Sequence, residues 1–570
     1  MDDDRIALNR RRFFEVLSSL GLGSTLLPDA LVIAAQDART VTVEMIAAAQ
    51  TMAGVEFTRQ EQEAIVTRVN AARGYLDGFA FLRAANLGNH AASALVFNPV
   101  PPGKALPSRR RGVTRAAPVV TRPGTDEEMA YLPVTHLAAL LQSRQVTSSE
   151  LTEIYLARLA KYDPRLHCVV SLTPALARAQ AREADAEIGR GRYRGPLHGV
   201  PFGLKDLFAV RGTTTTWGAS PYKDQVIDVD ATVYTRLRAA GAVLVAKLST
   251  GALALSAQWF GGLTRSPWNT ELDASGSSAG PGAATAAGLV GFSIGTDTGG
   301  SIMQPSARNG LSGLRPTFGQ VSRHGAMTLA WTQDTVGPMC RSAEDCALVF
   351  DAIYGPDGKD NTVLDVPFGW DASANVTTLR VGYLRSAVEP GSTGSTALTP
   401  LEVATRRNTA AAVQLLRERG VEVRPFDLPD VALEAIDFIR YVETAAAFEQ
   451  PTRDGTIREV ETGPEQSRRP AEIRSARFIP AVDYVQANRY RLQVMQQLDA
   501  AIGDLHVFIG VNLLLTNRTG HPAVSVPNGF FEGTPTALQM TGKLFGEPEL
   551  LLLAHAYQAR TDHHLKHPPL

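Results

Sequence analysis

Apolar positions recur along the chain in two patterns, one typical of helices and one typical of buried strands. Around residues 403–418 they return every three or four positions, which predicts an amphipathic helix. The short apolar runs at 242–246 and 505–509 have the length of buried strands. Such segments alternate from about residue 128 onward. This order predicts an α/β fold in which a mixed, largely parallel central sheet is covered by helices.

Polar residues predict where one long helix begins and ends. Thr147 and Glu150 have the spacing of a capping box, in which each residue satisfies a free backbone N–H at the start of a helix. The helical pattern runs through Leu159, and Asp163-Pro164 is expected to end it, since proline is a poor helix residue.

The first part of the chain differs from the rest in composition. Residues 42–86 predict two helices, and Thr58 with Glu61 forms a capping box for the second. Proline, arginine and glycine then dominate without periodicity, which is typical of a linker. The predicted organisation is a signal segment at 1–38, an N-terminal helical unit at 40–97, a linker at 98–127 and the main domain at 128–570.

The N-terminus carries an arginine run before two aromatic residues. Arg10, Arg11 and Arg12 precede Phe13 and Phe14, and a mildly apolar stretch follows. This pattern resembles a twin-arginine export signal and predicts an exported protein. The alternative is the basic start of a helix in a cytoplasmic protein.

Charge and cysteine content exclude several classes of function. The chain has 56 basic and 57 acidic residues, so no basic excess favours a nucleic-acid partner. Its three cysteines belong to no zinc-binding pattern, and we expect no metal and no cofactor. No apolar run reaches the roughly 18 residues that a membrane span requires, so stable membrane insertion is not expected.

One segment, residues 273–317, concentrates glycine, serine and alanine. The simplest interpretation is a flexible linker. However, residues 283–294 are apolar and long enough for a helix, and a solvated linker would not contain such a segment. A phosphate-binding loop is a second alternative. The segment has neither GxxxxGK[ST] nor GxGxxG, so nucleotide binding lacks support.

Three motifs in this segment, GSSAGPGAA, GTDTGGSI and NGLSGLRPT, follow an upstream GVPFGLKDL. In this order and spacing they resemble the amidase signature family. The resemblance implies the amidase signature fold and a Ser-cisSer-Lys triad, with Ser301 as nucleophile, Ser277 as proton relay and Lys205 as base. It also implies a cis peptide bond between Gly276 and Ser277.

The same resemblance implies an oxyanion hole made by backbone N–H groups. Thr298, Gly299 and Gly300 lead directly into Ser301, and the two glycines permit a turn that lets a substrate approach closely. Donors placed here would stabilise the negative charge that develops on a carbonyl oxygen.

Lys205 and Ser277 could also have structural rather than catalytic roles. A lysine can serve as base when burial lowers its pKa, and Lys205 follows an apolar, strand-like run. It could instead extend to water from a strand end or pair with Asp206. Ser277 could simply satisfy backbone groups, as serines in small loops often do.

The sequence departs from the family pattern at three places. The relay loop reads Ala279-Gly280-Pro281 where the family usually has glycines and a small residue. Met303 and Gln304 stand where the family usually has an arginine, so Asp297 is expected to lack its usual partner. After residues 508–510 the usual threonine-proline is absent, and the loop to Asn517 looks short, which would open the acyl pocket.

The function expected is hydrolysis of an acyl C–N bond, in an amide and also in a carbamate or ester, through an acyl-enzyme on Ser301. The first alternative is an A-type subunit of a glutamine-dependent amidotransferase, which acts on misacylated tRNA with partner subunits. The second is a binding homologue without activity. The expected partner is a small amide or carbamate substrate, and a homodimer is left open.

Overall fold

A computed structural model describes residues 41–570, except 54, 71–81, 83, 85–86, 90, 92–94, 116, 390–397 and 461–463. Its contacts divide the chain into two units. One comprises Met1–Leu87 with Phe478–Pro480, and the other comprises Gly88–Arg477 with Ala481–Leu570. The predicted export signal lies outside the described residues, and the predicted domain boundaries stay predictions.

Among the described residues of the first unit are the helices α3 (Val43–Ala53) and α4 (Arg59–Val69). Thr58 and Glu61 form the reciprocal capping box at the start of α4, as the sequence predicts. The predicted helical segment extends to residue 86, but most of residues 71–86 lie outside the described residues.

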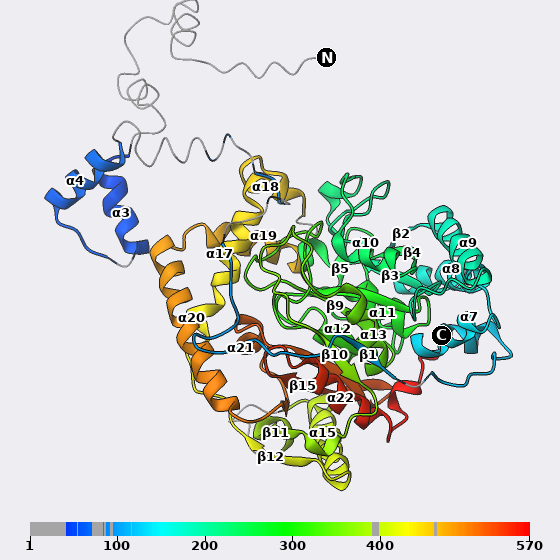
Figure 1. Ribbon diagram of the computed structural model, residues 1–570. Helices are drawn as coiled ribbons and strands as arrows, with labels where there is room; N and C mark the ends of the chain where they lie inside the picture. Colours follow the sequence, from blue (N-terminus) through cyan, green and yellow to red (C-terminus); the bar gives the residue numbers. More distant parts are fainter. Residues whose placement is uncertain are drawn as a thin grey trace, which may run out of the picture. The chain divides into compact units, whose positions relative to one another are not determined.

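A mixed sheet forms the centre of the second unit, and its described residues contribute eleven strands (Figure 1). From one edge to the other the order is β12 (Glu422–Phe426), β11 (Arg380–Leu384), β13 (Val507–Ile509), β15 (Thr534–Gly542), β14 (Ala523–Phe531), β8 (Ser312–Arg315), β9 (Thr335–Cys340), β7 (Phe292–Asp297), β3 (Pro201–Lys205), β4 (Val243–Leu248) and β2 (Val169–Leu172).

Parallel pairing is confined to two groups of strands. The strands β12, β11 and β13 are parallel, and so are β7, β3 and β4. The strands between these groups pair antiparallel, and β2 also pairs antiparallel with β4. The α/β class and the mixed sheet are confirmed, but the middle of the sheet is antiparallel and includes the hairpin of β14 and β15.

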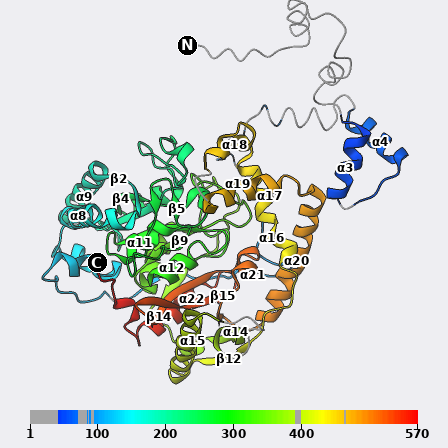
Figure 2. The ribbon, with the colours of Figure 1, turned by 180° about the vertical axis from the view of Figure 1, so that it is seen from behind.

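Helices cover the sheet, with α8 and α9 beside β2 and β4 and with α15 beside β12 (Figures 1 and 2). The helices of this unit are α6 (Asp126–Ala130), α7 (Val134–Gln142), α8 (Ser148–Leu166), α9 (Pro174–Gly189), α10 (Thr232–Ala239), α11 (Ala279–Ala286), α12 (Met303–Asn309), α13 (Ala343–Ile353), α14 (Arg385–Val388), α15 (Pro400–Glu418), α16 (Glu434–Asp437), α17 (Ile439–Ala447), α18 (Glu449–Arg453), α19 (Pro464–Ala476), α20 (Ala481–Ile502), α21 (Leu513–Arg518) and α22 (Glu547–Gln558).

Two expected boundaries are wrong. Helix α8 continues through Pro164 to Leu166, because a proline in the last turn removes only one hydrogen bond and Leu166 is fully buried. The apolar stretch at 283–294 is not one helix. It contains the end of α11, a turn and the start of β7, which an apolar run alone cannot distinguish.

The segment predicted as a linker contains a short strand, β1 (Gly112–Thr114), which pairs in parallel with β10 (Gly369–Asp371). A second small ladder joins β5 (Gln258–Trp259) and β6 (Gly262–Leu263). In the part of the chain that the structure describes, no helix is both long and apolar enough to cross a membrane.

Candidate active site

Lys205 is the last residue of β3 and is fully buried. Its Nζ donates hydrogen bonds to the hydroxyls of Ser277 at 2.8 Å, Ser278 at 3.0 Å and Thr296 at 2.8 Å. Three hydroxyl groups therefore surround the amine. Hydroxyls can accept from a protonated amine and can also donate to a neutral one, so this environment permits both protonation states.

Burial lowers the pKa of Lys205 to about 7, because an ammonium loses its hydration in the interior. The carboxylates of Asp297 and Asp334 act in the opposite direction. The neighbouring Asp206 does not pair with Lys205, since its Oδ1 lies 2.7 Å from the Nζ of Lys247. The structure thus excludes both a lysine that reaches water and a Lys205–Asp206 ion pair.

The relay candidate Ser277 lies in a tight loop before α11. The peptide bond between Gly276 and Ser277 is cis, as the resemblance implies. Glycine is required at position 276, because a Cβ there would lie 1.8 Å from the carbonyl oxygen of Ser256. The backbone N–H of Ser278 donates to the carbonyl of Ser301 at 3.3 Å, which brings the two motifs together. Among the described residues, no hydrogen bond links the hydroxyls of Ser277 and Ser301.

Asp297 organises the loop that carries Ser301. Its buried carboxylate accepts hydrogen bonds from the backbone N–H groups of Gly300 at 2.7 Å, Ile302 at 2.8 Å and Met303 at 3.2 Å. The Nδ2 of Asn517 donates to the same carboxylate at 2.6 Å. Asp297, which was expected to lack its usual partner, is thus bonded by backbone N–H groups and by a distant asparagine.

The hydrogen bond from Gly300 corrects the expected oxyanion hole. An N–H has one hydrogen, and that of Gly300 is donated to Asp297. In the described part of the chain, the backbone N–H groups of Thr298, Gly299 and Ser301 have no hydrogen-bond acceptor. These three remain available to a substrate oxygen, while Gly300 supplies the turn with a φ of 113°.

A family model described as Amidase matches residues 150–509. The chain belongs to the amidase signature family. The A-type subunit of the glutamyl-tRNA(Gln) amidotransferase from Methylococcus capsulatus is 32% identical over 486 residues, covering 76% of this chain and 98% of that protein. The corresponding subunit from Chloroflexus aggregans is 34% identical over 500 residues, covering 78% and 99%.

Solved structures include amidases of this family. The native peptide amidase from Stenotrophomonas maltophilia is 30% identical and matches with a TM-score of 0.67, covering 75% of this chain and 96% of that chain. The family match spans the segment that carries Lys205, Ser277 and Ser301. The amidase signature fold and family are thus established for this chain.

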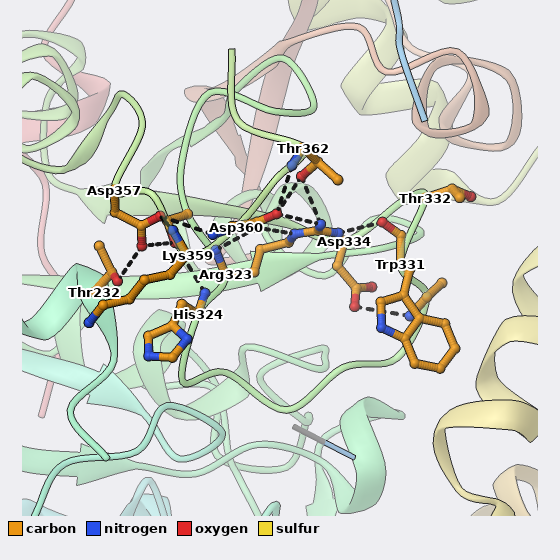
Figure 3. A network of polar contacts seen from close by, with 12 residues as sticks. Thr232, Arg323, His324, Trp331, Thr332, Asp334, Asp357, Lys359, Asp360 and Thr362 are labelled. Atoms are coloured by element: carbon orange, nitrogen blue, oxygen red, sulfur yellow. Dashed lines mark hydrogen bonds and ion pairs between the residues drawn. The ribbon is translucent and has the colours of Figure 1, made fainter. Parts of the chain in front are cut away.

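The amidase signature site borders a cavity. Thr296, Thr298 and Asp334 line it near Lys205, and Trp331 lies in its wall. Further along, Arg323 forms an ion pair with Asp360 at 2.8 Å (Figure 3). The apolar lining residues are Leu207, Ala254, Met327 and Leu329. The lining of the cavity beside the site therefore combines apolar surface with charged groups.

Asp334 is a site residue that the sequence analysis missed. It is nearly buried, and its carboxylate accepts from the hydroxyl of Thr298 at 2.6 Å and from the backbone N–H groups of Leu329 and Ala330 at 2.8 and 2.9 Å. Burial raises the pKa of Asp334. It joins the cavity wall to the loop of the amidase signature motif, and no motif in the sequence indicates it.

Other partners were also missed. Ser278 and Thr296 contact Lys205, and Asn517 contacts Asp297, although none was singled out. The first two lie inside the quoted motifs, next to Ser277 and Asp297, so their position was a usable signal. Asn517 lies more than two hundred positions away, and only the fold brings it to Asp297.

Proposed function

We propose that this chain cleaves an acyl C–N bond through an acyl-enzyme on Ser301. The Oγ of Ser301 attacks the carbonyl carbon and gives its proton to Ser277, which passes a proton to the neutral Nζ of Lys205. The N–H groups of Thr298, Gly299 and Ser301 donate to the oxyanion. The proton then returns to the leaving nitrogen, the C–N bond breaks, and water attacks the acyl-enzyme by the reverse route to release the acid.

The observation that carries this proposal is the 2.8 Å hydrogen bond between Lys205 and Ser277 in a fully buried setting. A lysine with an ordinary pKa of about 10.4 is almost entirely protonated at neutral pH and cannot accept a proton. With a pKa of about 7, Lys205 is neutral in a large fraction of molecules. The relay serine is in direct contact with this base.

A second function shares the same chemistry. If the amide is that of glutamine, the first half of the reaction releases ammonia, which an amidotransferase delivers to an acceptor with the help of partner subunits. The relatives named above are amidotransferase subunits that match almost over their whole length, so comparison supports this function more strongly than a free-standing amidase. The likeness to a peptide amidase supports the latter.

Labelling with a fluorophosphonate tests the step common to both functions. Peptide mapping by mass spectrometry should place the adduct on Ser301, and Ser301→Ala should remove it. An adduct on Ser277 would overturn the assignment. Absence of any adduct, together with absence of amide cleavage, would favour the inactive binding homologue.

Two measurements separate the amidase from the amidotransferase subunit. The purified chain alone is assayed for ammonia release from glutamine and for cleavage of aryl amides, peptide amides and carbamates. A free-standing amidase should cleave members of the panel without a partner. An amidotransferase subunit should prefer glutamine and copurify with other subunits when the tagged chain is isolated from its host.

The location of the protein in the cell is a third criterion that separates the amidase from the amidotransferase subunit. We propose export in folded form, which the arginine run at Arg10, Arg11 and Arg12 supports and which opposes a role on tRNA. Replacing these three arginines by lysine should retain the protein in the cytoplasm of a host with a working twin-arginine pathway. Retention of the parent chain itself would favour the amidotransferase subunit.

A further inference from the structure

Arg518 ends α21 next to the loop that carries Ser301. Its side chain is 1% exposed, whereas the neighbouring Gly299 is exposed to solvent. A Cβ placed on Gly299 would have a single described heavy atom within 4 Å, the Nη1 of Arg518 at 3.9 Å. The space in front of Gly299 is therefore open, and the guanidinium of Arg518 borders it.

Three contacts fix the position of this guanidinium. The preceding residue, Asn517, donates to Asp297 of the nucleophile loop at 2.6 Å. The carbonyl of Arg518 accepts a hydrogen bond from the Nε of Arg491, and its Nη2 forms an ion pair with Asp437 of α16. The backbone and one nitrogen of the guanidinium are thus held in place before any substrate binds.

The other two nitrogens of the guanidinium have no partner among the described residues. Both Nε and Nη1 of Arg518 are shielded from solvent, and neither donates a hydrogen bond. A buried charged donor without an acceptor is unfavourable, and this penalty is relieved when an acceptor arrives. Positions with such a donor beside a reactive loop are suited to binding a ligand.

The local charge favours an anion as that acceptor. The Oδ1 of Asp437 is shared by Arg518 and by Arg440, whose Nε lies 3.4 Å away. Two guanidinium cations therefore meet one carboxylate, which leaves an excess of positive charge. The pKa of Arg518 is lowered by burial and, in smaller part, by Arg440. A carboxylate of a ligand would neutralise this excess positive charge and accept hydrogen bonds from the Nε and Nη1 groups of Arg518.

We propose that Arg518 binds a carboxylate on the acyl portion of the substrate, so that the preferred substrates are amides of acids carrying a second, free carboxylate. This inference rests on the proposed function, because it places the scissile amide at Ser301. It assigns Arg518 a role in selecting the substrate, separate from the proton transfers at Lys205.

The test measures protection of Ser301 from the fluorophosphonate by matched pairs of amides. One member is the monoamide of a linear dicarboxylic acid, from succinamate to adipamate, and the other has an isopropyl group in place of the carboxylate. In the parent, the acid should protect about tenfold or more better than its neutral partner at one or more chain lengths. Arg518→Met should bring this ratio close to one, and Arg518→Lys should retain part of it.

Arg440→Met is the matched control, because it removes the other guanidinium from the same carboxylate but leaves the free N–H groups of Arg518, so it should lower the ratio less than Arg518→Met does. Thermal melting of each variant reports whether it is folded. Either substitution leaves Asp437 with one arginine partner, so the two variants are matched in this respect. A ratio near one in the parent, or an equal loss in both variants, would overturn the role of Arg518. Failure to label Ser301 in the parent would instead contradict the proposed function.

Discussion

Two buried lysines occupy adjacent strands of the sheet and differ in their partners. Lys205 ends β3, and Lys247 lies in β4 opposite Leu204. Both are fully buried. The Nζ of Lys247 forms an ion pair with Asp206 at 2.7 Å and donates to the carbonyl of Thr214. The hydrogen bonds of the Lys205 Nζ within the described residues all go to hydroxyl groups.

The difference shows what separates a structural lysine from a candidate base. A carboxylate in direct contact compensates the charge of an ammonium, and Lys247 holds two segments together through this ion pair. Hydroxyl groups compensate the charge only partly, so the amine of Lys205 can lose its proton near neutral pH. Equal burial and similar flanking residues therefore lead to different chemistry, and each prediction below alters one side of this contrast.

The largest effect is expected at Lys205. Replacing it by alanine should lower kcat/KM by about 10²- to 10⁴-fold, the range typical of a lost general base. Arginine should be equally damaging, because a guanidinium stays charged and cannot accept a proton. The measurement is kcat/KM for the best amide of the panel. A Lys205→Arg enzyme with near-parental activity would show that the lysine is structural.

The next effect concerns stability. Lys247→Met leaves Asp206 as a buried carboxylate without its cation, which should reduce the free energy of unfolding by about 3–5 kcal/mol. Urea denaturation measures this loss. The double variant Lys247→Met with Asp206→Asn should recover much of it, since no net charge is then left buried. If the single variant were as stable as the parent, the ion pair would not have the role assigned to it.

The pH profile tests the role of Lys205 without mutation. Lys205 must be neutral to act, so kcat/KM should rise with pH, by about tenfold per unit below its pKa, and level off above about 7. Because the base and its serines form one unit, the profile reports a macroscopic ionisation of the group. A rate that still rises through pH 9 would mean that the base is a lysine with an ordinary pKa.

Local signals predicted much of the fold. The capping box at Thr58 and the strand that ends at Lys205 both occur where the sequence places them. The boundary between α11 and β7 was not predictable, because small apolar residues pack equally well in a buried helix and a buried strand. The antiparallel centre of the sheet depends on pairing between distant segments, which hydrophobic periodicity does not encode.

In the site, too, local motifs predicted some residues, whereas residues from distant segments were not predictable. Motifs identified Lys205 and Ser277, which the fold brings into contact at 2.8 Å. They gave no indication that Asp334 or Arg518 lies beside the loop that carries Ser301, because only the fold brings these distant segments to it. They also placed Gly300 among the oxyanion donors, and only the three-dimensional structure shows that its N–H is already engaged by Asp297.

The smallest effect is expected from a substitution at Thr296, which removes one of the hydroxyl groups bonded to Lys205 and so sharpens the contrast between the two lysines. Its Oγ1 accepts a hydrogen bond from Nζ at 2.8 Å, and this contact stabilises the protonated amine. Valine has the same shape without the hydroxyl, so Thr296→Val should destabilise the cation and lower the pKa of Lys205 further. The midpoint of the pH profile should then move toward lower pH by about one unit or less, since one unit corresponds to about 1.4 kcal/mol. Thr285→Val is a suitable control, because Thr285 is also fully buried and bonds to Ser293 rather than to the lysine. A midpoint that moves to higher pH in Thr296→Val would mean that the hydroxyl stabilises the neutral amine, and Lys205 would then accept its proton with Thr296 as a donor.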